Sequence, residues 1–234
     1  MSSGKVAVIV GGGSGMGAGA AERLKQDGFE IAILSSSGKG EVLAQKFGGL
    51  GITGSNRSQD DLQKLSDACM QRWGRIDVLV NSAGHGPKGQ LLALSDEDWL
   101  LGMEVYLMNV VRTTRLFAPI MEQQGSGAII NISSFSAVEP SGTFPTSSVF
   151  RAGLSAYTRL FAEKYAPANV RMNNVLPGFI DSLPEKPGIK EQIPMARYGK
   201  VSEVAALISH LASDAAAYIT GQNIRIDGGI TRSL

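Results

Sequence analysis

Glycine fills six of the nine positions from residue 11 to residue 19, where the chain reads Gly-Gly-Gly-Ser-Gly-Met-Gly-Ala-Gly. An apolar run at 6–10 precedes this segment, and a helical pattern at 18–27 follows it. Glycine lets the backbone turn sharply and approach a pyrophosphate, and the following helix offers free N–H groups and a positive dipole end. A plain glycine turn is the alternative. The flanking strand and helix favour a phosphate-binding loop.

Short apolar runs alternate with helical patterns along the rest of the chain. The runs are residues 6–10, 31–34, 78–80, 128–132, 170–176 and 224–226. Helices are predicted over 62–73 and 204–211, the second with Ser202 as its N-cap. Strands that are apolar on both faces belong to parallel sheets covered by helices, so the pattern predicts an α/β fold with a doubly wound sheet. Ligands of such sheets bind beyond the carboxyl ends of the strands.

Composition limits the classes of protein and partner. The 234 residues, 43% of them hydrophobic, predict one domain spanning 1–234. A net charge of +1 without a charged block argues against nucleic-acid and membrane-surface partners. The single cysteine, Cys69, excludes an internal disulfide, and with no signal peptide or long apolar run this predicts a cytoplasmic protein. No metal site is predicted.

Several ordered motifs follow the glycine-rich segment. Residues 11–17 resemble T-G-x-x-x-G-x-G with Val10 in place of the threonine, and residues 81–84 resemble N-N-A-G. Further matches are Asn109 on the next long helix, Ser134 after an apolar strand, P-G-x-x-x-T at 177–182, and a C-terminal signature at 218–222 and 227–229. Together these motifs cover nearly the whole chain and resemble the short-chain dehydrogenase/reductase family.

The resemblance implies a fold, a cofactor and an assembly. The fold is a single Rossmann-type doubly wound parallel sheet of about seven strands flanked by helices, and the assembly is a homo-oligomer, either a tetramer or a dimer. The implied dinucleotide contacts are Gly11, Gly13, Ser14, Gly15, Met16, Gly17, Ser35, Ser36, Asn81, Ala83, Gly84, Arg151, Pro177, Gly178, Ile180 and Ser182. Ser134 is the implied catalytic serine, and Asn109 is expected to anchor a water chain.

The chain departs from the family at two catalytic positions. The family carries Tyr thirteen residues after the serine and Lys four residues later, where this chain has Ser147 and Arg151. A Tyr hydroxyl whose pKa is lowered by a nearby Lys is a good general acid near neutral pH. A serine hydroxyl is far less acidic and shorter by a ring, so Ser147 is expected only to orient the substrate oxygen. Arg151 can hold ribose hydroxyls and keeps a positive charge, but it does not exchange protons.

Few residues can replace the missing acid. His85 follows the residues 81–84 motif and titrates near neutrality, so it is a candidate acid, with a loop histidine of no role as the alternative. Tyr106 lies one helical turn before Asn109 and either points the same way or packs between helices. Lys88 and His210 are expected at the surface.

The end of the second strand bears on the choice of dinucleotide. An acidic residue there would hydrogen-bond the ribose 2′-OH and repel a 2′-phosphate. The chain instead has Ser35, Ser36 and Ser37, followed by Lys39. Hydroxyls and a cation favour NADP, with NAD or a turn that makes no contact as alternatives. The family Asp near the adenine is also missing, and Ser55 and Asn56 occupy that region.

The leading hypothesis is an NADP-dependent oxidoreductase with an atypical proton relay, acting on the carbonyl or alcohol of a small molecule. A nucleotide-binding protein without redox turnover, serving as a sensor or assembly partner, fits the broken catalytic set equally well. A non-redox lyase is the third reading, because halohydrin dehalogenases use Arg where this family has Lys. Those proteins keep the Tyr and lose the glycine-rich loop, which is the opposite of this chain. The Pro-rich segment 183–193 is expected to form a compact lid over the substrate.

Overall fold

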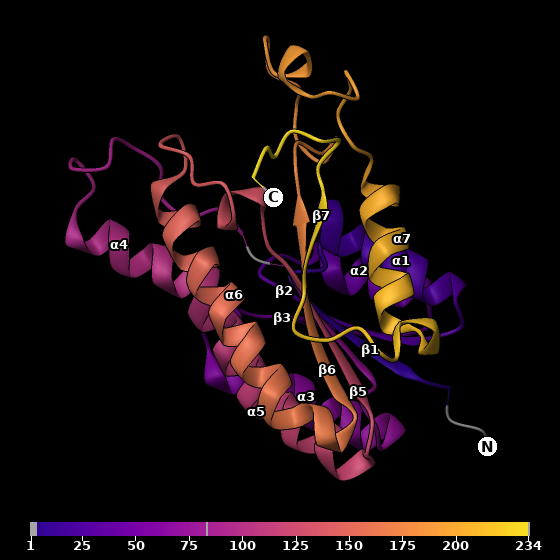
Figure 1. Ribbon diagram of the computed structural model, residues 1–234. Coiled ribbons are helices and arrows are strands. Elements are labelled where there is room, and N and C mark those ends of the chain that lie inside the picture. Colours follow the sequence, from indigo (N-terminus) through magenta and orange to yellow (C-terminus); the bar gives the residue numbers. More distant parts are fainter. Residues whose placement is uncertain (1–3, 83, 234) are drawn as a thin grey trace.

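A seven-stranded parallel sheet organises the protein, and its strand order is β3-β2-β1-β4-β5-β6-β7 (Figure 1). The computed structural model describes residues 4–82 and 84–233. The strands are β1 (Val6–Val10), β2 (Glu30–Ser35), β3 (Leu50–Thr53), β4 (Val78–Ser82), β5 (Gly127–Ile132), β6 (Val170–Pro177) and β7 (Asn223–Ile226). The predicted doubly wound parallel sheet is confirmed. The six apolar runs coincide with six of these strands, and the seventh, β3, lies at the sheet edge.

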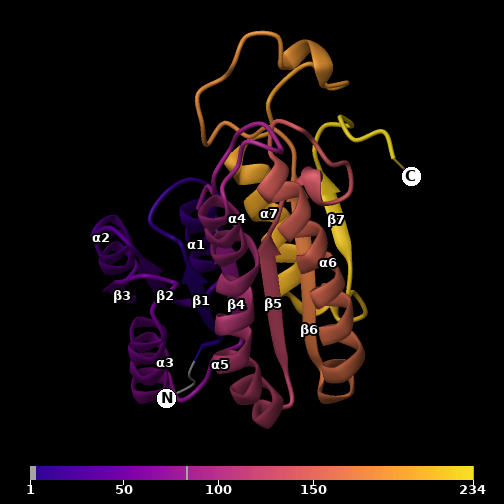
Figure 2. The same ribbon diagram turned by 90° about the vertical axis from the view of Figure 1, so that its left-hand side faces the viewer.

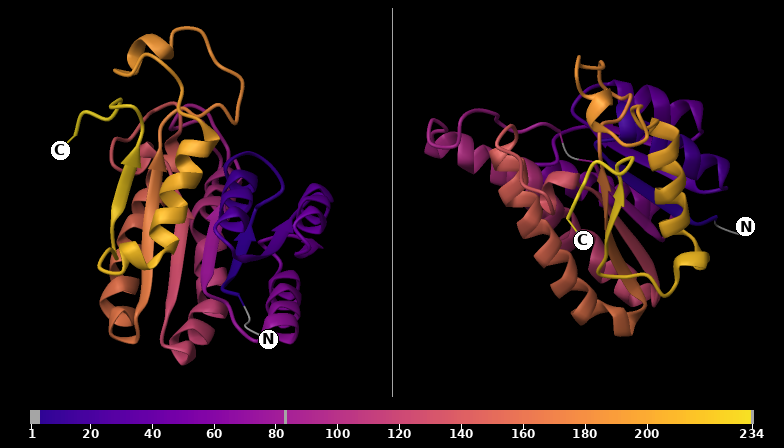
Figure 3. Two further views of the ribbon diagram at one scale, coloured as in Figure 1. Left: turned by 90° about the vertical axis from the view of Figure 1, so that its right-hand side faces the viewer. Right: turned by 45° about the horizontal axis from the view of Figure 1, so that its top comes forward.

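Helices cover both faces of the sheet. One layer holds α1 (Gly15–Gln26), α2 (Lys39–Lys46) and α7 (Val201–Ala212), and the other holds α3 (Gln59–Trp73), α5 (Asn109–Gln124) and α6 (Pro145–Tyr165) (Figures 2 and 3). Side chains alternate across β1, so Ala7 and Ile9 pack under the first layer while Val8 and Val10 pack under the second. This double burial explains the continuous apolar strands. No helix in the described ranges is long and apolar enough to cross a bilayer.

Two helix starts differ from the sequence prediction. The first helix begins at Gly15 rather than at residue 18, because the glycine-rich loop already turns into helix there. The helix α7 begins at Val201 with Lys200 as its N-cap, so Ser202 lies inside the first turn and is not the cap. The carboxylate of Glu203, the third residue of the helix, accepts the N–H of the N-cap residue Lys200 at 2.7 Å, as in one half of a capping box.

The helix before β5 contains a π-helical turn. Helix α4 (Asp96–Met103) runs into η1 (Glu104–Met108), which continues directly as α5. Arg112 binds both carboxylate oxygens of Glu104 at 2.6 and 2.8 Å, and this ion pair spans the turn. Short 3-10 turns occur at Phe135–Ala137, Ala166–Ala168, Lys190–Gln192 and Asp214–Ala216. Single π turns inside α-helices are frequent at functional sites, and this one faces the cavity described below.

A ladder of asparagines crosses the sheet at one level. Asn81, Asn131, Asn174 and Asn223 are register partners on β4, β5, β6 and β7. Their amides form a continuous chain of hydrogen bonds of 2.9, 2.9 and 2.8 Å. Thr113 on α5 also donates to the Asn81 side chain at 2.9 Å. Asn81 was expected to contact the dinucleotide, but its side chain is buried within this ladder and does not reach the rim.

Candidate active site

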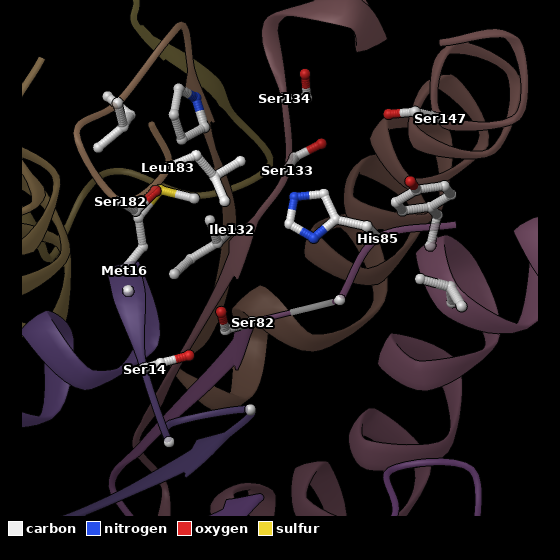
Figure 4. A pocket seen from close by; sticks show the side chains of 18 of the residues that line it. Ser14, Met16, Ser82, His85, Ile132, Ser133, Ser134, Ser147, Ser182 and Leu183 are labelled. Atoms are coloured by element: carbon white, nitrogen blue, oxygen red, sulfur yellow. The ribbon is translucent and has the colours of Figure 1, made fainter. Parts of the chain in front are cut away.

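A cavity of about 750 Å³ opens at the carboxyl ends of the strands (Figure 4). Most of the residues expected to contact the dinucleotide line it. They are Gly11, Gly13, Ser14, Gly15, Met16, Ser35, Ser36, Gly84, Arg151, Pro177, Gly178, Ile180 and Ser182. Ala83 lies outside the described residues. The expected catalytic residues Ser134, Ser147, Arg151 and His85 line the same cavity.

The glycine-rich loop is shaped by close backbone contacts. Gly11 has φ +87°, and a Cβ there would collide with the carbonyl oxygen of Ser82. Gly17 does not line the cavity, because it is buried beneath the loop, where a Cβ would lie 2.5 Å from the Gly11 oxygen. The N-cap of α1, Ser14, makes no side-chain cap bond, and the first turn holds no acidic residue. The helix therefore presents its positive end to an anion in the cavity.

Three serine hydroxyls form a hydrogen-bonded chain, in which the fully buried Ser136 joins the two lining residues Ser134 and Ser147. Ser136 Oγ donates to Ser134 Oγ at 3.1 Å, and the oxygens of Ser136 and Ser147 are 3.2 Å apart. Figure 4 shows Ser134 and Ser147 at the cavity, with the hydroxyl of Ser147 turned inward. Ser136 was not predicted as a site residue, although its place two residues after Ser134 was a usable signal. These hydroxyls can orient a substrate oxygen, but an aliphatic hydroxyl is a weak acid.

Arg151 places a buried cation at the cavity. Its side chain reaches from α6, and Nη1 donates to the Ile132 carbonyl at 2.9 Å. The residue is 7% exposed, and burial lowers the pKa of its guanidinium to about 10, which still leaves it charged at neutral pH. Nε has no hydrogen-bond partner, and no acidic side chain pairs with Arg151 among the residues that the structure describes. This charge is available to an electron-rich ligand.

Tyr106, and not Asn109, reaches the cavity from the π turn. Tyr106 lines the cavity at 5% exposure, and its ring centroid lies 4.6 Å from the Arg151 guanidinium carbon. Asn109 is buried at the start of α5, where its Oδ1 accepts the Val110 N–H at 2.7 Å. The two residues are close to one helical turn apart, and the π turn changes which of them faces inward. The expected water anchor is therefore absent from the described lining residues.

The loop carrying His85 is fastened at two points. The Gly86 N–H donates to the Tyr106 hydroxyl oxygen at 2.6 Å, and Thr146 Oγ1 donates to the Pro87 carbonyl at 2.8 Å. Figure 4 shows the His85 ring extending into the middle of the cavity, below Ser133 in this view. Partial desolvation, followed by the charges of Lys88 and Arg151, lowers the pKa of His85 below its ordinary value. Neutral imidazole therefore predominates at neutral pH, which weakens His85 as an acid.

The far end of the cavity differs from the predicted arrangement. Ser35 Oγ donates to the Ser37 carbonyl at 2.5 Å and accepts the Gly40 N–H at 3.2 Å, so this hydroxyl holds the loop together. Ser36 and Ser37 are exposed and line the cavity, while Lys39 is not among the described lining residues. Arg57 lines the cavity beside Ser55 and Asn56 and was missed. The signal available in the sequence was the basic residue that directly follows Ser55 and Asn56.

Three aromatic side chains, Phe135, Phe179 and Tyr198, form a continuous part of the cavity wall. The ring centroids of Phe135 and Phe179 are 5.8 Å apart, as are those of Phe179 and Tyr198. The segment after β6 rises above the sheet edge in Figure 1 and contributes Leu183, Pro184 and Lys186 to the lining. The Tyr198 hydroxyl oxygen accepts the Lys186 N–H at 3.0 Å, which ties this segment to the cavity. His210, in contrast, is exposed on α7, as expected.

The lining has a strong charge bias. Its cationic side chains are Arg57, Lys88, Arg151 and Lys186, and no Asp or Glu is found among the described residues of the cavity. Lys88 was expected only at the surface, and although exposed it also borders the cavity, with its ammonium 5.2 Å from the Phe144 ring centroid. A cavity with cations at both ends and no carboxylate favours an anionic ligand.

Comparison with known proteins gives concordant matches. The family model described as enoyl-(acyl carrier protein) reductase matches residues 11–231. The chain is 33% identical to the 3-oxoacyl-[acyl-carrier-protein] reductase FabG of Thermotoga maritima, over 97% of this chain and 98% of that protein. It is 34% identical to dehydrogenase/reductase SDR family member 4 of Caenorhabditis elegans, over 99% and 96%. The solved TT0495 protein of Thermus thermophilus superposes with a TM-score of 0.88 at 29% identity, covering 97% and 98%.

Proposed function

The chain belongs to the short-chain dehydrogenase/reductase family of NAD(P)-dependent oxidoreductases, and from that premise we propose that it uses NADP(H) to interconvert a small-molecule carbonyl and alcohol. The observation that carries the proposal is the cavity itself. It combines an uncapped helix N-terminus, four cationic side chains and no carboxylate among its described lining residues. A dinucleotide with an additional 2′-phosphate is the anion that suits this arrangement.

The lining residues divide the dinucleotide site into regions. The loop around Gly11 and the first turn of α1 would hold the pyrophosphate. Gly178, Ile180 and Ser182 would border the nicotinamide, with Arg151 toward its ribose. When bound, the reduced cofactor supplies a hydride. Ser134 and Ser147 orient the substrate oxygen, and the Arg151 charge stabilises the negative charge that develops there.

The 2′-phosphate would lie near Ser36, Ser37 and Arg57. Replacing Arg57 with alanine removes a charge-assisted contact worth roughly 1.5–3 kcal/mol, so NADPH affinity should fall about 10- to 100-fold while NADH affinity changes little. Fluorescence titration with both nucleotides measures this difference. Lys46→Ala is the matched control, because Lys46 is an exposed cation on α2 that is not among the lining residues. If Arg57→Ala lowers the affinity for NADPH and NADH equally, Arg57 does not bind the 2′-phosphate.

The substrate is proposed to be a 3-oxoacyl thioester. Relatives named 3-oxoacyl-[acyl-carrier-protein] reductase support this class, and the aromatic wall around Phe179 offers an apolar surface for an acyl chain. Acetoacetyl-coenzyme A is a suitable first probe. Single-turnover oxidation of bound NADPH by this thioester tests the function, and a tighter Kd for NADPH than for NADH tests the cofactor. Preference for NADH would contradict the cofactor assignment.

A nucleotide-binding protein without redox turnover is the second candidate. The observation that favours it is Ser147 at the position of the family's proton donor, since serine is a poor acid. This candidate predicts tight NADPH binding with no oxidation by any carbonyl. A failure to bind either nucleotide would instead favour a non-redox reaction on the same scaffold.

A further inference from the structure

We propose that Tyr106 is the general acid of this site and gives its phenolic proton to the substrate oxygen. The inference rests on the proposed oxidoreductase function and supplies the group that Ser147 cannot replace. Tyr106 lines the cavity together with Ser134, Ser147 and Arg151. It projects from the π turn, which gives this buried phenol a fixed position.

The hydrogen bonding of Tyr106 leaves its proton free. The phenolic oxygen accepts the Gly86 N–H at 2.6 Å, so this contact occupies a lone pair and not the O–H. Within residues 4–82 and 84–233, that O–H has no protein acceptor. The proton can therefore point into the cavity, where a carbonyl oxygen of the substrate would accept it. The same N–H would stabilise the phenolate that remains after the transfer.

Arg151 supplies the complementary charge. Its guanidinium lies over the Tyr106 ring, and no carboxylate neutralises it among the described side chains. A cation at this position stabilises both the oxyanion on the substrate and the phenolate on Tyr106. The pairing of a tyrosine with a fixed cation is thus preserved, although the tyrosine comes from another helix and the cation is an arginine.

The serine hydroxyls and the His85 imidazole are poorer acids for this step. Ser134 and Ser147 carry aliphatic hydroxyls that belong to the serine chain. His85 has a lowered pKa and is mostly neutral at neutral pH. Tyr106 carries a phenolic hydroxyl and is held in place by the loop contact.

The step balances as a simple carbonyl reduction. The carbonyl carbon receives a hydride from the reduced nicotinamide, and the C=O π electrons move to the oxygen. The Tyr106 O–H bond breaks as a new O–H bond forms on the substrate, giving the alcohol and a phenolate. Water then returns a proton to Tyr106.

Tyr106→Phe tests the assignment because it keeps the ring over Arg151 and removes the hydroxyl. Single-turnover oxidation of NADPH by acetoacetyl-coenzyme A should slow about 10²- to 10⁴-fold. NADPH affinity should stay close to wild type, and the melting temperature should fall by no more than several degrees, because the Gly86 N–H loses its acceptor. Binding of the alcohol product, 3-hydroxybutyryl-coenzyme A, should weaken roughly fivefold in calorimetry, since one neutral hydrogen bond is lost.

Two controls separate acid chemistry from loop positioning. Thr146→Val removes the other tie of the His85 loop, the bond to the Pro87 carbonyl, and leaves Tyr106 intact. This variant should lose at most a few-fold in rate. Tyr165→Phe removes a phenol that stacks on Phe161 away from the cavity and should match wild type.

Several outcomes would overturn the proposal. A Tyr106→Phe protein that reduces the thioester at the wild-type rate excludes Tyr106, and so does a Thr146→Val protein with an equal loss. If His85→Gln slows the single-turnover reaction while Tyr106→Phe keeps the wild-type rate, His85 is the general acid instead of Tyr106. If the wild-type protein binds NADPH but never oxidises it, the proposed function fails together with its acid, and this result differs from a failure of Tyr106 alone.

Discussion

Gly17→Ala is expected to weaken nucleotide binding without any side chain entering the cavity. The new Cβ would lie 2.5 Å from the Gly11 carbonyl oxygen, whereas ordinary contacts begin at 3.4 Å. Helix α1 and the loop must therefore separate by about 0.9 Å. Since N–H···O bonds form at about 2.9 Å and weaken beyond about 3.2 Å, this movement removes one or two phosphate contacts. At roughly 1.5–3 kcal/mol for a charge-assisted bond, affinity for NADPH should fall about 10- to 100-fold or more.

The same substitution should also lower stability. Overpacking a tight contact costs about 1–3 kcal/mol, which corresponds to a melting temperature lower by several degrees, at roughly 2–4 °C per kcal/mol. Fluorescence titration measures the affinity, and thermal unfolding measures the stability. Gly142→Ala is the control, because a Cβ there meets nothing within 4 Å and the backbone is not left-handed. A folded Gly17→Ala protein with wild-type NADPH affinity would refute the reasoning that this contact sets the phosphate loop.

Three further predictions concern stability. Asn131→Leu should lower the free energy of unfolding by about 2–5 kcal/mol in urea titrations, because it leaves ladder groups of Asn81 and Asn174 unpaired; an unchanged value would contradict this. The bond to Arg197, and then the Lys200 N–H, lower the pKa of Glu203 to about 2 from 4.5. Glu203→Gln should therefore lower the melting temperature by roughly 1–3 °C at neutral pH. This difference should disappear as the pH falls from 4.5 toward about 2, whereas a difference that stays constant with pH would show that the charge of the carboxylate does not contribute to stability. Cys69 is fully buried, and burial raises the pKa of its thiol to about 12, so a thiol reagent should label it only on opening of the core; rapid labelling of the folded protein would contradict that packing.

The fold was predictable because its signals are local and repeated. Apolar strands such as residues 6–10 reflect burial on both faces, and the glycine-rich loop reflects contacts that tolerate no side chain. The strand β3 was missed because Leu50–Thr53 is short, half-buried and interrupted by Gly51. At the edge of the sheet it lacks the continuous apolar character of the central strands.

The misassigned site residues depend on the direction of single side chains. Asn81 follows a strand in the right motif, but its amide joins the cross-sheet ladder. The choice between Tyr106 and Asn109 depends on a π turn that periodicity does not report. Ser35 stands at the expected position, yet its hydroxyl closes its own loop. In each case the position was correct to within a turn, and the local backbone or a hydrogen bond of the side chain decided the role.

The π turn at Glu104–Met108 makes the length of this helix a constraint in its own right. Each residue of an α-helix advances the chain by about 100° around the axis. A π turn holds about one residue more than an α turn, so deleting one residue here, for example Leu107, would restore α-helical spacing while α4 and α5 keep nearly the same orientation, and only the side chains of the turn would change direction. Tyr106 would then leave the cavity, although every contacting residue remained in the chain. A single deletion in the turn would therefore remove the phenol from the site while the packing of α4 and α5 is kept.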